Sequence, residues 1–122
     1  MAIPRDLRLK KNRDFQAVKK EGTRRVYPYF IAQLRHPRKG AVDSKAKTSL
    51  GIIAARRVGN AVVRNRGKRL MRNLFLKYMD VLPAGSQLVI VLRLGFQNEP
   101  LARLEKDFLN ACNWFKQNAA EK

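Results

Sequence analysis

The segment between Asp43 and Asp80 holds ten Lys and Arg side chains and no carboxylate. The ten are Lys45, Lys47, Arg56, Arg57, Arg64, Arg66, Lys68, Arg69, Arg72 and Lys77. Cations without nearby acids bind the phosphates of a polyanion, and such binding weakens as the salt concentration rises. The segment therefore predicts a phosphate-binding surface whose natural partner is nucleic acid.

The chain offers no set of side chains for covalent or metal-assisted catalysis. His36 is the only histidine and Cys112 the only cysteine, so neither a nucleophile–base set nor a cluster of metal ligands can be assembled. Carboxylates are missing from the basic segment, where a nuclease would need them to hold metal ions. We therefore predict no catalytic residue and no metal site, and we expect Cys112 to fill the core.

The positive charge is concentrated in the first two thirds of the chain. Residues 1–79 contain 22 Lys and Arg against four Asp and Glu, and the formal net charge of the whole chain is +18. An anionic membrane is the competing polyanion, but the basic segment lacks the exposed apolar face of an interfacial helix. The N-terminus has no apolar core of signal-peptide length, and the aliphatic run at residues 88–92 is too short to span a bilayer. We therefore expect a cytoplasmic protein that does not bind membranes.

The apolar pattern predicts the elements that must position these cations. The length of 122 residues and the hydrophobic content of 45% suit one domain over residues 1–122. The expected class is α/β, in the order helix-strand-strand-helix-strand-helix around a small central sheet. The helices are predicted at residues 13–21, 61–81 and from Pro100 onward, and the strands at residues 27–34, 49–56 and 87–94. Asn12 and Asn60 are the expected N-caps of the first two helices, and Gly22 the end of the first.

The long second helix sorts its residues into an apolar face with cations on both margins. At about 100° per residue, the apolar stripe comprises Val63, Leu70, Met71, Leu74 and Tyr78, with Gly67 at its middle. One margin carries Arg64, Lys68 and Arg72, with Asn65 and Arg69 beside them. The opposite margin carries Arg66 and Lys77. One helix could thus contact two anionic surfaces, and Gly67 would let it pack closely on the sheet.

The segment from Arg57 to Arg72, which reads RVGNAVVRNRGKRLMR, resembles the Arg-Asn-Arg signature of the protein component of bacterial ribonuclease P. Residues 7–15, LRLKKNRDF, are similar to that family's first helix, and the order of elements over residues 7–118 is similar too. The resemblance implies a left-handed crossover around the long helix. That hand is rare among parallel βαβ units, so general rules would not have predicted it.

The resemblance implies that the protein assists RNA cleavage without performing it. In that family a large catalytic RNA with bound Mg²⁺ removes the 5′ leader of precursor tRNA. The expected partners are therefore the catalytic RNA and precursor tRNA, with one protein per RNA. The expected metal is Mg²⁺ held by the RNA subunit.

The resemblance also implies two RNA-binding surfaces. The surface for the catalytic RNA corresponds to Arg56, Arg57, Asn60, Arg66 and Arg69. The cleft for the single-stranded 5′ leader corresponds to Phe15, Lys19, Phe30, Arg64, Asn65, Lys68 and Arg72. Single-stranded RNA needs an aromatic platform and a cationic track, and the two phenylalanines would supply the platform. Lys19 and Gln33 stand where many relatives have an aromatic residue, which predicts a more electrostatic cleft.

Two other functions share part of this pattern. A ribosomal or other structural RNA-binding protein would carry the same charges, so the signature and the aromatic and basic cleft residues alone argue against it. A nuclease in its own right is opposed by the missing carboxylates. Apart from the resemblance, Phe15 and Phe30 also suit a hydrophobic core, and Trp114 suits partly buried packing.

Overall fold

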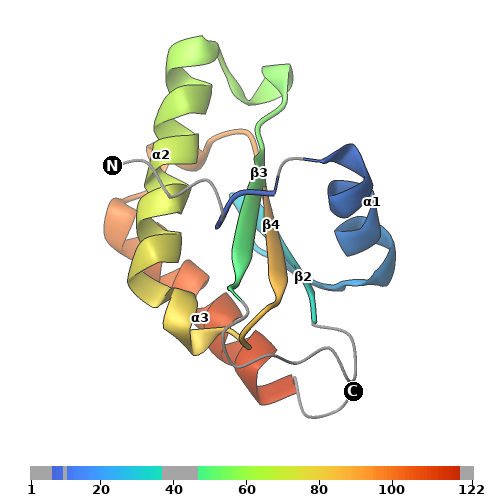
Figure 1. The fold of residues 1–122 in the computed structure, drawn as a ribbon. Helices are drawn as coiled ribbons and strands as arrows, with labels where there is room; N and C mark the ends of the chain where they lie inside the picture. Colours follow the sequence, from blue (N-terminus) through green and yellow to red (C-terminus); the bar gives the residue numbers. More distant parts are fainter. Residues whose placement is uncertain (1–6, 10, 37–46, 119–122) are drawn as a thin grey trace.

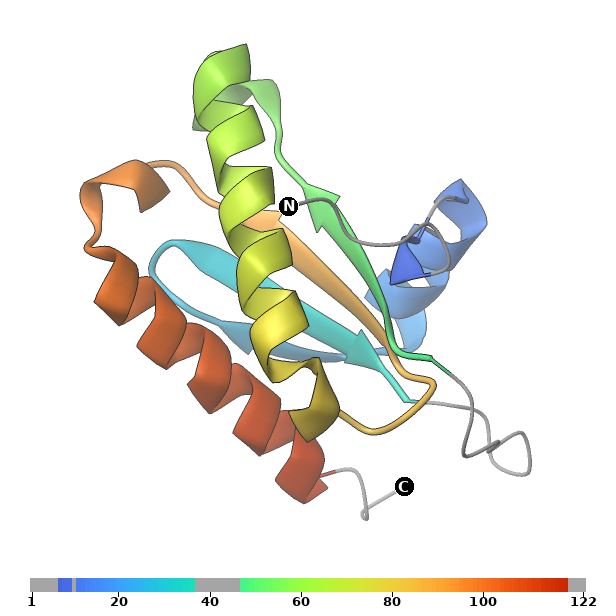
Figure 2. The same ribbon diagram turned by 60° about the vertical axis from the view of Figure 1, so that its left-hand side comes forward.

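A β-sheet separates one helix from the other two (Figure 1). The computed structural model describes residues 7–9, 11–36 and 47–118. One sheet face carries α1 (Asn12–Glu21), and the other carries α2 (Ala61–Tyr78) and α3 (Leu101–Asn118) (Figure 2). The strands are β1 (Thr23–Val26), β2 (Phe30–Arg35), β3 (Ser49–Ile53) and β4 (Gln87–Leu92), in the spatial order β1-β2-β4-β3. The predicted α/β class is confirmed.

The crossover between β3 and β4 is the feature that places α2. The β1–β2 and β2–β4 pairs are antiparallel, whereas β3 and β4 are parallel, so the chain must cross a sheet face between them. In Figure 2, α2 lies in front of the sheet, both strands point upward, and β4 lies to the left of β3. The crossover is therefore left-handed, as the resemblance implied.

The first strand of the sheet was missed, and the second was placed too early. β1 carries two adjacent arginines and is exposed at alternate residues, so its apolar signal is weak. The turn between β1 and β2 consists of Tyr27, Pro28 and Tyr29. These residues had been predicted to begin a strand. The amide of Tyr27 closes this turn by donating to the carbonyl of Phe30 at 2.9 Å.

The predicted helix ends are right in two cases and wrong in two. The Asn60 side chain accepts a hydrogen bond from the Val63 amide at 3.0 Å, which confirms it as the N-cap of α2. Gly22 follows the last residue of α1, as predicted. Asn12, however, is the first helical residue, and Lys11 occupies the cap position without a side-chain hydrogen bond. The long helix ends at Tyr78, because residues 79–81 form a tighter 3₁₀ turn.

Two predicted strands end early, and most of one predicted loop lies outside the described residues. β3 stops at Ile53 rather than at residue 56, and a 3₁₀ helix, η2 (Arg56–Val58), follows it before α2. β4 stops at Leu92 rather than at residue 94. Within the loop predicted at residues 36–47, residues 37–46 lie outside the described part of the chain.

The main core lies between the sheet and the pair α2 and α3. After Pro100 the sequence also predicts an apolar stripe of Leu101, Leu104, Phe108, Ala111, Cys112 and Phe115, and all of it but the exposed Leu101 is buried there. Gly67 lets α2 approach the sheet closely, as predicted. A Cβ atom at that position would lie 2.7 Å from both Leu92 Cδ1 and Phe96 Cζ. On the other face of the sheet, the fully buried Val18 anchors α1.

Cys112 is expected to be unreactive while the protein is folded. Its side chain is buried in α3, and burial raises the pKa of the thiol to about 12. At pH 8 only about one thiol in ten thousand would then be the reactive thiolate. We expect no reaction with an aromatic disulfide reagent in the native state and release of one equivalent after denaturation. Rapid native-state labelling would contradict this burial, and Cys112→Ser provides the zero-labelling control.

Candidate nucleic-acid interface

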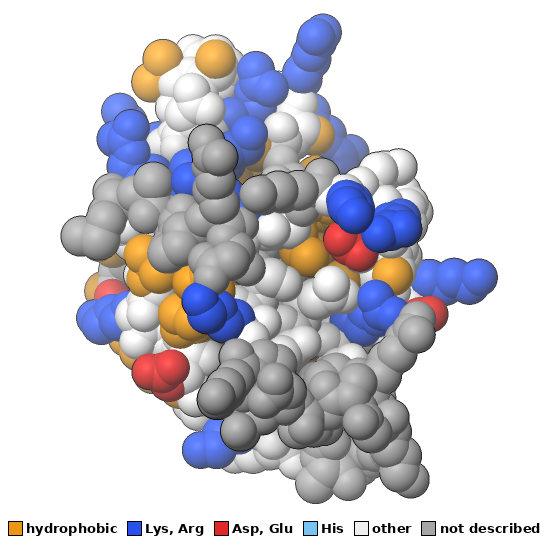
Figure 3. Space-filling model, viewed as in Figure 1, with side chains coloured by type: hydrophobic (Ala, Val, Ile, Leu, Met, Phe, Trp, Pro, Cys, Tyr) orange, Lys and Arg blue, Asp and Glu red, His pale blue; other side chains and the backbone are white. Residues whose placement is uncertain are grey.

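Seven cations of η2 and α2 form no ion pair with any acid in the described parts of the chain. They are Arg56, Arg57, Arg64, Arg66, Lys68, Arg69 and Arg72. In Figure 3, Lys and Arg side chains gather around the N-terminal half of α2 at the top of the molecule, where no Asp or Glu appears on this face. Their charge is therefore available to an external anion, as the sequence predicted.

Unlike these seven cations, Lys77 has an acidic partner, which α3 supplies. Its Nζ lies 2.6 Å from Oε2 of Glu105, and the hydroxyl of Tyr78 donates to the same carboxylate oxygen. The hydrogen bond from Lys77 lowers the pKa of Glu105, and the same bond raises the pKa of Lys77. This cluster ties α2 to α3, so Lys77 has an acidic partner that the seven cations lack.

The outward margin of α2 presents the first candidate surface. Arg66 and Arg69, together with Asn65 and Val62, line a shallow hollow of about 280 Å³. Arg56 and Arg57 are exposed just before the helix, whose N-terminal amides also favour anions. Asn60, also predicted to bind RNA here, is exposed and caps α2 with its side-chain oxygen.

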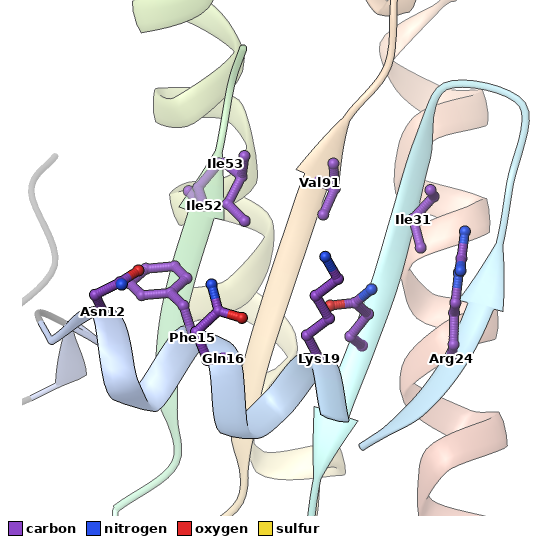
Figure 4. Close-up of a pocket in the computed structure, with 10 residues that line it drawn as sticks. Asn12, Phe15, Gln16, Lys19, Arg24, Ile31, Ile52, Ile53 and Val91 are labelled. Carbon is purple, nitrogen blue, oxygen red and sulfur yellow. The ribbon is translucent and has the colours of Figure 1, made fainter. Parts of the chain in front are cut away.

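A cleft of about 590 Å³ between α1 and the sheet is the second candidate surface. Its lining comprises Asn12, Phe15, Gln16 and Lys19 from α1, and Arg24, Ile31, Gln33, Ile52, Ile53 and Val91 from the strands. Figure 4 shows α1 crossing the strands, with its polar side chains along one edge of the cleft and aliphatic side chains on the strands beyond it. No Asp or Glu belongs to this lining. The cleft therefore suits a ligand with both apolar and anionic parts.

Phe15 connects this cleft with the cations of α2. Its ring lies over Gly51 of β3, where a Cβ atom would be 2.5 Å from Phe15 Cε1. The same ring lines a second hollow, of about 140 Å³, together with Arg8, Lys68 and Arg72. The structure thus brings together Phe15, Lys68 and Arg72 as one continuous surface. Lys19, also predicted, lines the far part of the cleft.

Phe30 was wrongly predicted to line the cleft. It is fully buried on the opposite face of the sheet, where its ring stacks on that of Tyr27 with centroids 4.9 Å apart. Alternate residues of a strand face opposite sides, so Ile31 and Gln33 face the cleft and Phe30 does not. Phe15 is therefore the one predicted aromatic residue that can offer a platform there.

Asn65 and Arg64 do not line the two hollows that contain Phe15. Asn65 lies beside Arg66 and Arg69 on the outward margin of α2. Arg64 is half-buried and lines neither hollow that contains Phe15. Its Nε is buried without a hydrogen-bond partner in the described part of the chain.

Several residues that line these hollows were not predicted from the sequence. They are Arg8, Gln16, Arg24, Ile31, Ile53 and Val91. Ile31, Ile53 and Val91 lie on strands that had been predicted. The alternation of side chains between the two faces of a strand could therefore have identified them. Arg24 could not have been found, because its strand had not been predicted.

Within residues 7–9, 11–36 and 47–118, no three His, Cys, Asp or Glu side chains come together as metal ligands. Across the same ranges, every helix is too short or too polar to cross a membrane.

Comparisons with known proteins identify the relatives of this chain. A family model described as Ribonuclease P matches residues 3–116. The ribonuclease P protein component of Brevibacillus brevis is 35% identical over 106 residues, which cover 87% of this chain and 80% of that protein. The corresponding protein of Streptomyces bikiniensis is 32% identical over 111 residues, covering 86% and 88%. The solved structure of the RNase P protein from Thermotoga maritima matches with a TM-score of 0.72 and 28% identity, covering 87% of this chain and 94% of that one.

Proposed function

The chain belongs to the family of ribonuclease P protein components, the protein subunits of a tRNA-processing ribonucleoprotein, and from this membership we propose how its two surfaces act. The outward margin of α2, with Arg56, Arg57, Arg66 and Arg69, docks on the phosphates of the catalytic RNA. The cleft beside Phe15, with Lys19, Lys68 and Arg72, binds the single-stranded 5′ leader of precursor tRNA. One protein binds one catalytic RNA in the cytoplasm.

The observation that carries this proposal is that α2 contributes to both surfaces. Arg66 and Arg69 line the outward hollow, whereas Lys68 and Arg72 line the hollow that shares Phe15 with the cleft. Folded RNA is contacted mainly at phosphates and 2′-hydroxyls, which suits the first set. A single strand also needs a stacking platform, which suits the second. A protein bound through one margin of the helix would therefore hold the leader along the other.

In this proposal the bond is broken by the RNA subunit. Mg²⁺ bound by that RNA supplies the charge stabilisation and the activated water that phosphodiester hydrolysis requires. The protein contributes affinity and positioning, because phosphate contacts fix register and orientation. Its cations also lower the repulsion between two RNA molecules, so its effect should be largest at low Mg²⁺.

Reconstitution at low Mg²⁺ tests the proposed function. We expect the purified chain to stimulate cleavage of precursor tRNA by a bacterial ribonuclease P RNA, and to cleave nothing alone. Lys68→Ala and Arg72→Ala should each weaken binding of leader-bearing precursor by about 1 kcal/mol, or roughly fivefold, while binding of mature tRNA is unchanged. Dissociation constants of the reconstituted complex, measured with both RNAs, provide the comparison.

Lys116→Ala is the matched control, since Lys116 is an exposed lysine on α3, away from both surfaces. If Lys68→Ala and Arg72→Ala weaken the binding of precursor and mature tRNA equally, these residues do not bind the leader. Absence of stimulation, with similar affinity for unrelated RNAs, would instead favour a structural RNA-binding protein.

A further inference from the structure

The helix α1 forms one wall of the cleft, and it is attached to the sheet at both ends. At its N-terminal end the Phe15 ring lies over Gly51 of β3. At its C-terminal end Gly22 packs against β2, where a Cβ atom would lie 2.8 Å from the carbonyl oxygen of Leu34. Figure 4 shows α1 crossing from β3 toward β2, with Phe15 near the first strand and Lys19 near the second. The contacts with β2 therefore hold the end of α1 that carries Lys19.

An ion pair reinforces this attachment of α1 to β2. Nε of Arg35, the last residue of β2, lies 2.8 Å from Oε2 of Glu21, the last residue of α1. Nη1 of Arg35 also donates a hydrogen bond to Oε1 of Gln87 on β4 at 3.1 Å, and the strand register places these two residues opposite each other. The Arg35 side chain is only 16% exposed. The sheet therefore holds the guanidinium group in place, and Glu21 binds to it from the end of the helix.

Neither helix stability nor RNA binding explains an acid at the position of Glu21. The negative end of the helix dipole disfavours a carboxylate in the last turn, where Lys19 and Lys20 already supply the favourable charge. A carboxylate also repels phosphates, and the lining of the neighbouring cleft contains no acid. The charge-assisted contact with Arg35 opposes both effects. The carboxylate of Glu21 is therefore best explained by what it does to the position of α1.

We propose that Glu21 is a positioning residue, which binds Arg35, holds the C-terminal end of α1 against β2 and thereby sets where Lys19 lies over the cleft. This inference rests on the proposed function of the cleft. Neither Glu21 nor Arg35 belongs to the lining of the cleft, so both act on the leader through α1. A helix that is fixed before the leader arrives loses less conformational freedom on binding, which increases the affinity.

Glu21→Gln tests this role, because positioning and simple electrostatics predict effects of opposite sign. The variant keeps the shape of the side chain and removes one negative charge. If Glu21 positions α1, the reconstituted complex should bind leader-bearing precursor tRNA about two- to fivefold more weakly, which is the range of an exposed ion pair. Binding of mature tRNA should be unchanged. If Glu21 were only an acid near RNA, the same variant would bind the precursor more tightly.

Coupling to Lys19 provides a readout that a purely structural role would not move. Lys19→Ala removes the side chain that Glu21 is proposed to position, so adding Glu21→Gln to that variant should cause no further loss of precursor affinity. The exchange of Glu21→Arg with Arg35→Glu rebuilds the ion pair in reverse and should recover most of the wild-type affinity. Asp14→Asn is the matched control, because Asp14 lies on the same helix but forms no ion pair with a described residue. The control should not weaken precursor binding.

Three results would each overturn the positioning role of Glu21. They are unchanged or tighter precursor binding by Glu21→Gln, an equal loss for mature tRNA, and a full additional loss in the Lys19→Ala background. Thermal unfolding checks that each variant is folded at the temperature of the binding assay. If Lys68→Ala still weakens precursor binding selectively when Glu21→Gln does not, the proposed function of the cleft stands and only this inference fails. If neither variant is selective for the leader, both fail together.

Discussion

Replacing Arg66 and Arg69 together by alanine is expected to lower the affinity for the catalytic RNA by more than 100-fold. Both guanidinium groups line the outward hollow of α2, and neither has an acidic partner in the described residues. A hydrogen bond to a charged group contributes about 1.5–3 kcal/mol, so two lost contacts cost about 3 kcal/mol or more. The dissociation constant for the RNA, measured by filter binding at fixed Mg²⁺, provides the readout.

The salt dependence separates direct contacts from a general loss of positive charge. If each arginine contacts one phosphate, the loss of both contacts should reduce the magnitude of the slope of log affinity against log salt concentration by about 1.4–1.8. The control is Lys106→Ala with Lys116→Ala, which removes the same charge from exposed positions of α3. If the control lowers the affinity and the slope as much as the arginine pair, the surface on α2 is not the docking site. The free energies of unfolding of the two double variants should each agree with that of the wild type within about 0.5 kcal/mol.

Elements with strong local signals could be predicted from the sequence. The N-cap at Asn60, the buried stripe of α3 and the close approach at Gly67 follow from capping and from a period of 3.6 residues, which depend on neighbours along one helix. The same arithmetic placed Lys68 and Arg72 on one margin of α2, as the structure has them, but it put Arg69 beside that margin, whereas Arg69 lies with Arg66 at the outward hollow.

Features that depend on the partner element could not be predicted in this way. Phe30 could face either side of its strand, and only the position of α1 relative to β2 decides that the cleft lies on the side of Ile31. The pairing of Lys77 with Glu105 joins residues on two helices that the sequence does not bring together. β1 was missed because an edge strand with two arginines gains its stability from pairing with β2 and not from its own apolar residues.

The buried face of α2 holds its two cationic surfaces in place, and the apolar stripe predicted for that face was incomplete. The predicted stripe included Met71 and Leu74, which are buried, but it omitted Phe75, which is fully buried. Phe75 lies about 60° around the helix from Arg72, toward the packed face. The cationic margin that reaches Phe15 is thus supported by an aromatic side chain just beneath it. A residue that stabilises the fold and residues proposed to bind RNA are therefore neighbours in this part of the helix.

Phe75→Ala is expected to lower the free energy of unfolding by about 3–5 kcal/mol, because it removes a fully buried ring and leaves a cavity between α2 and the sheet. Urea denaturation followed by circular dichroism measures this change. Asn73→Ala is the control, since Asn73 is exposed on the same helix and should shift stability by no more than about 0.5 kcal/mol. Catalytic RNA at about 100 times its dissociation constant should restore about 2.7 kcal/mol, because it binds the folded state. A loss below about 1 kcal/mol would contradict the packing of Phe75, and no restoration by RNA would contradict binding of the catalytic RNA to the folded state.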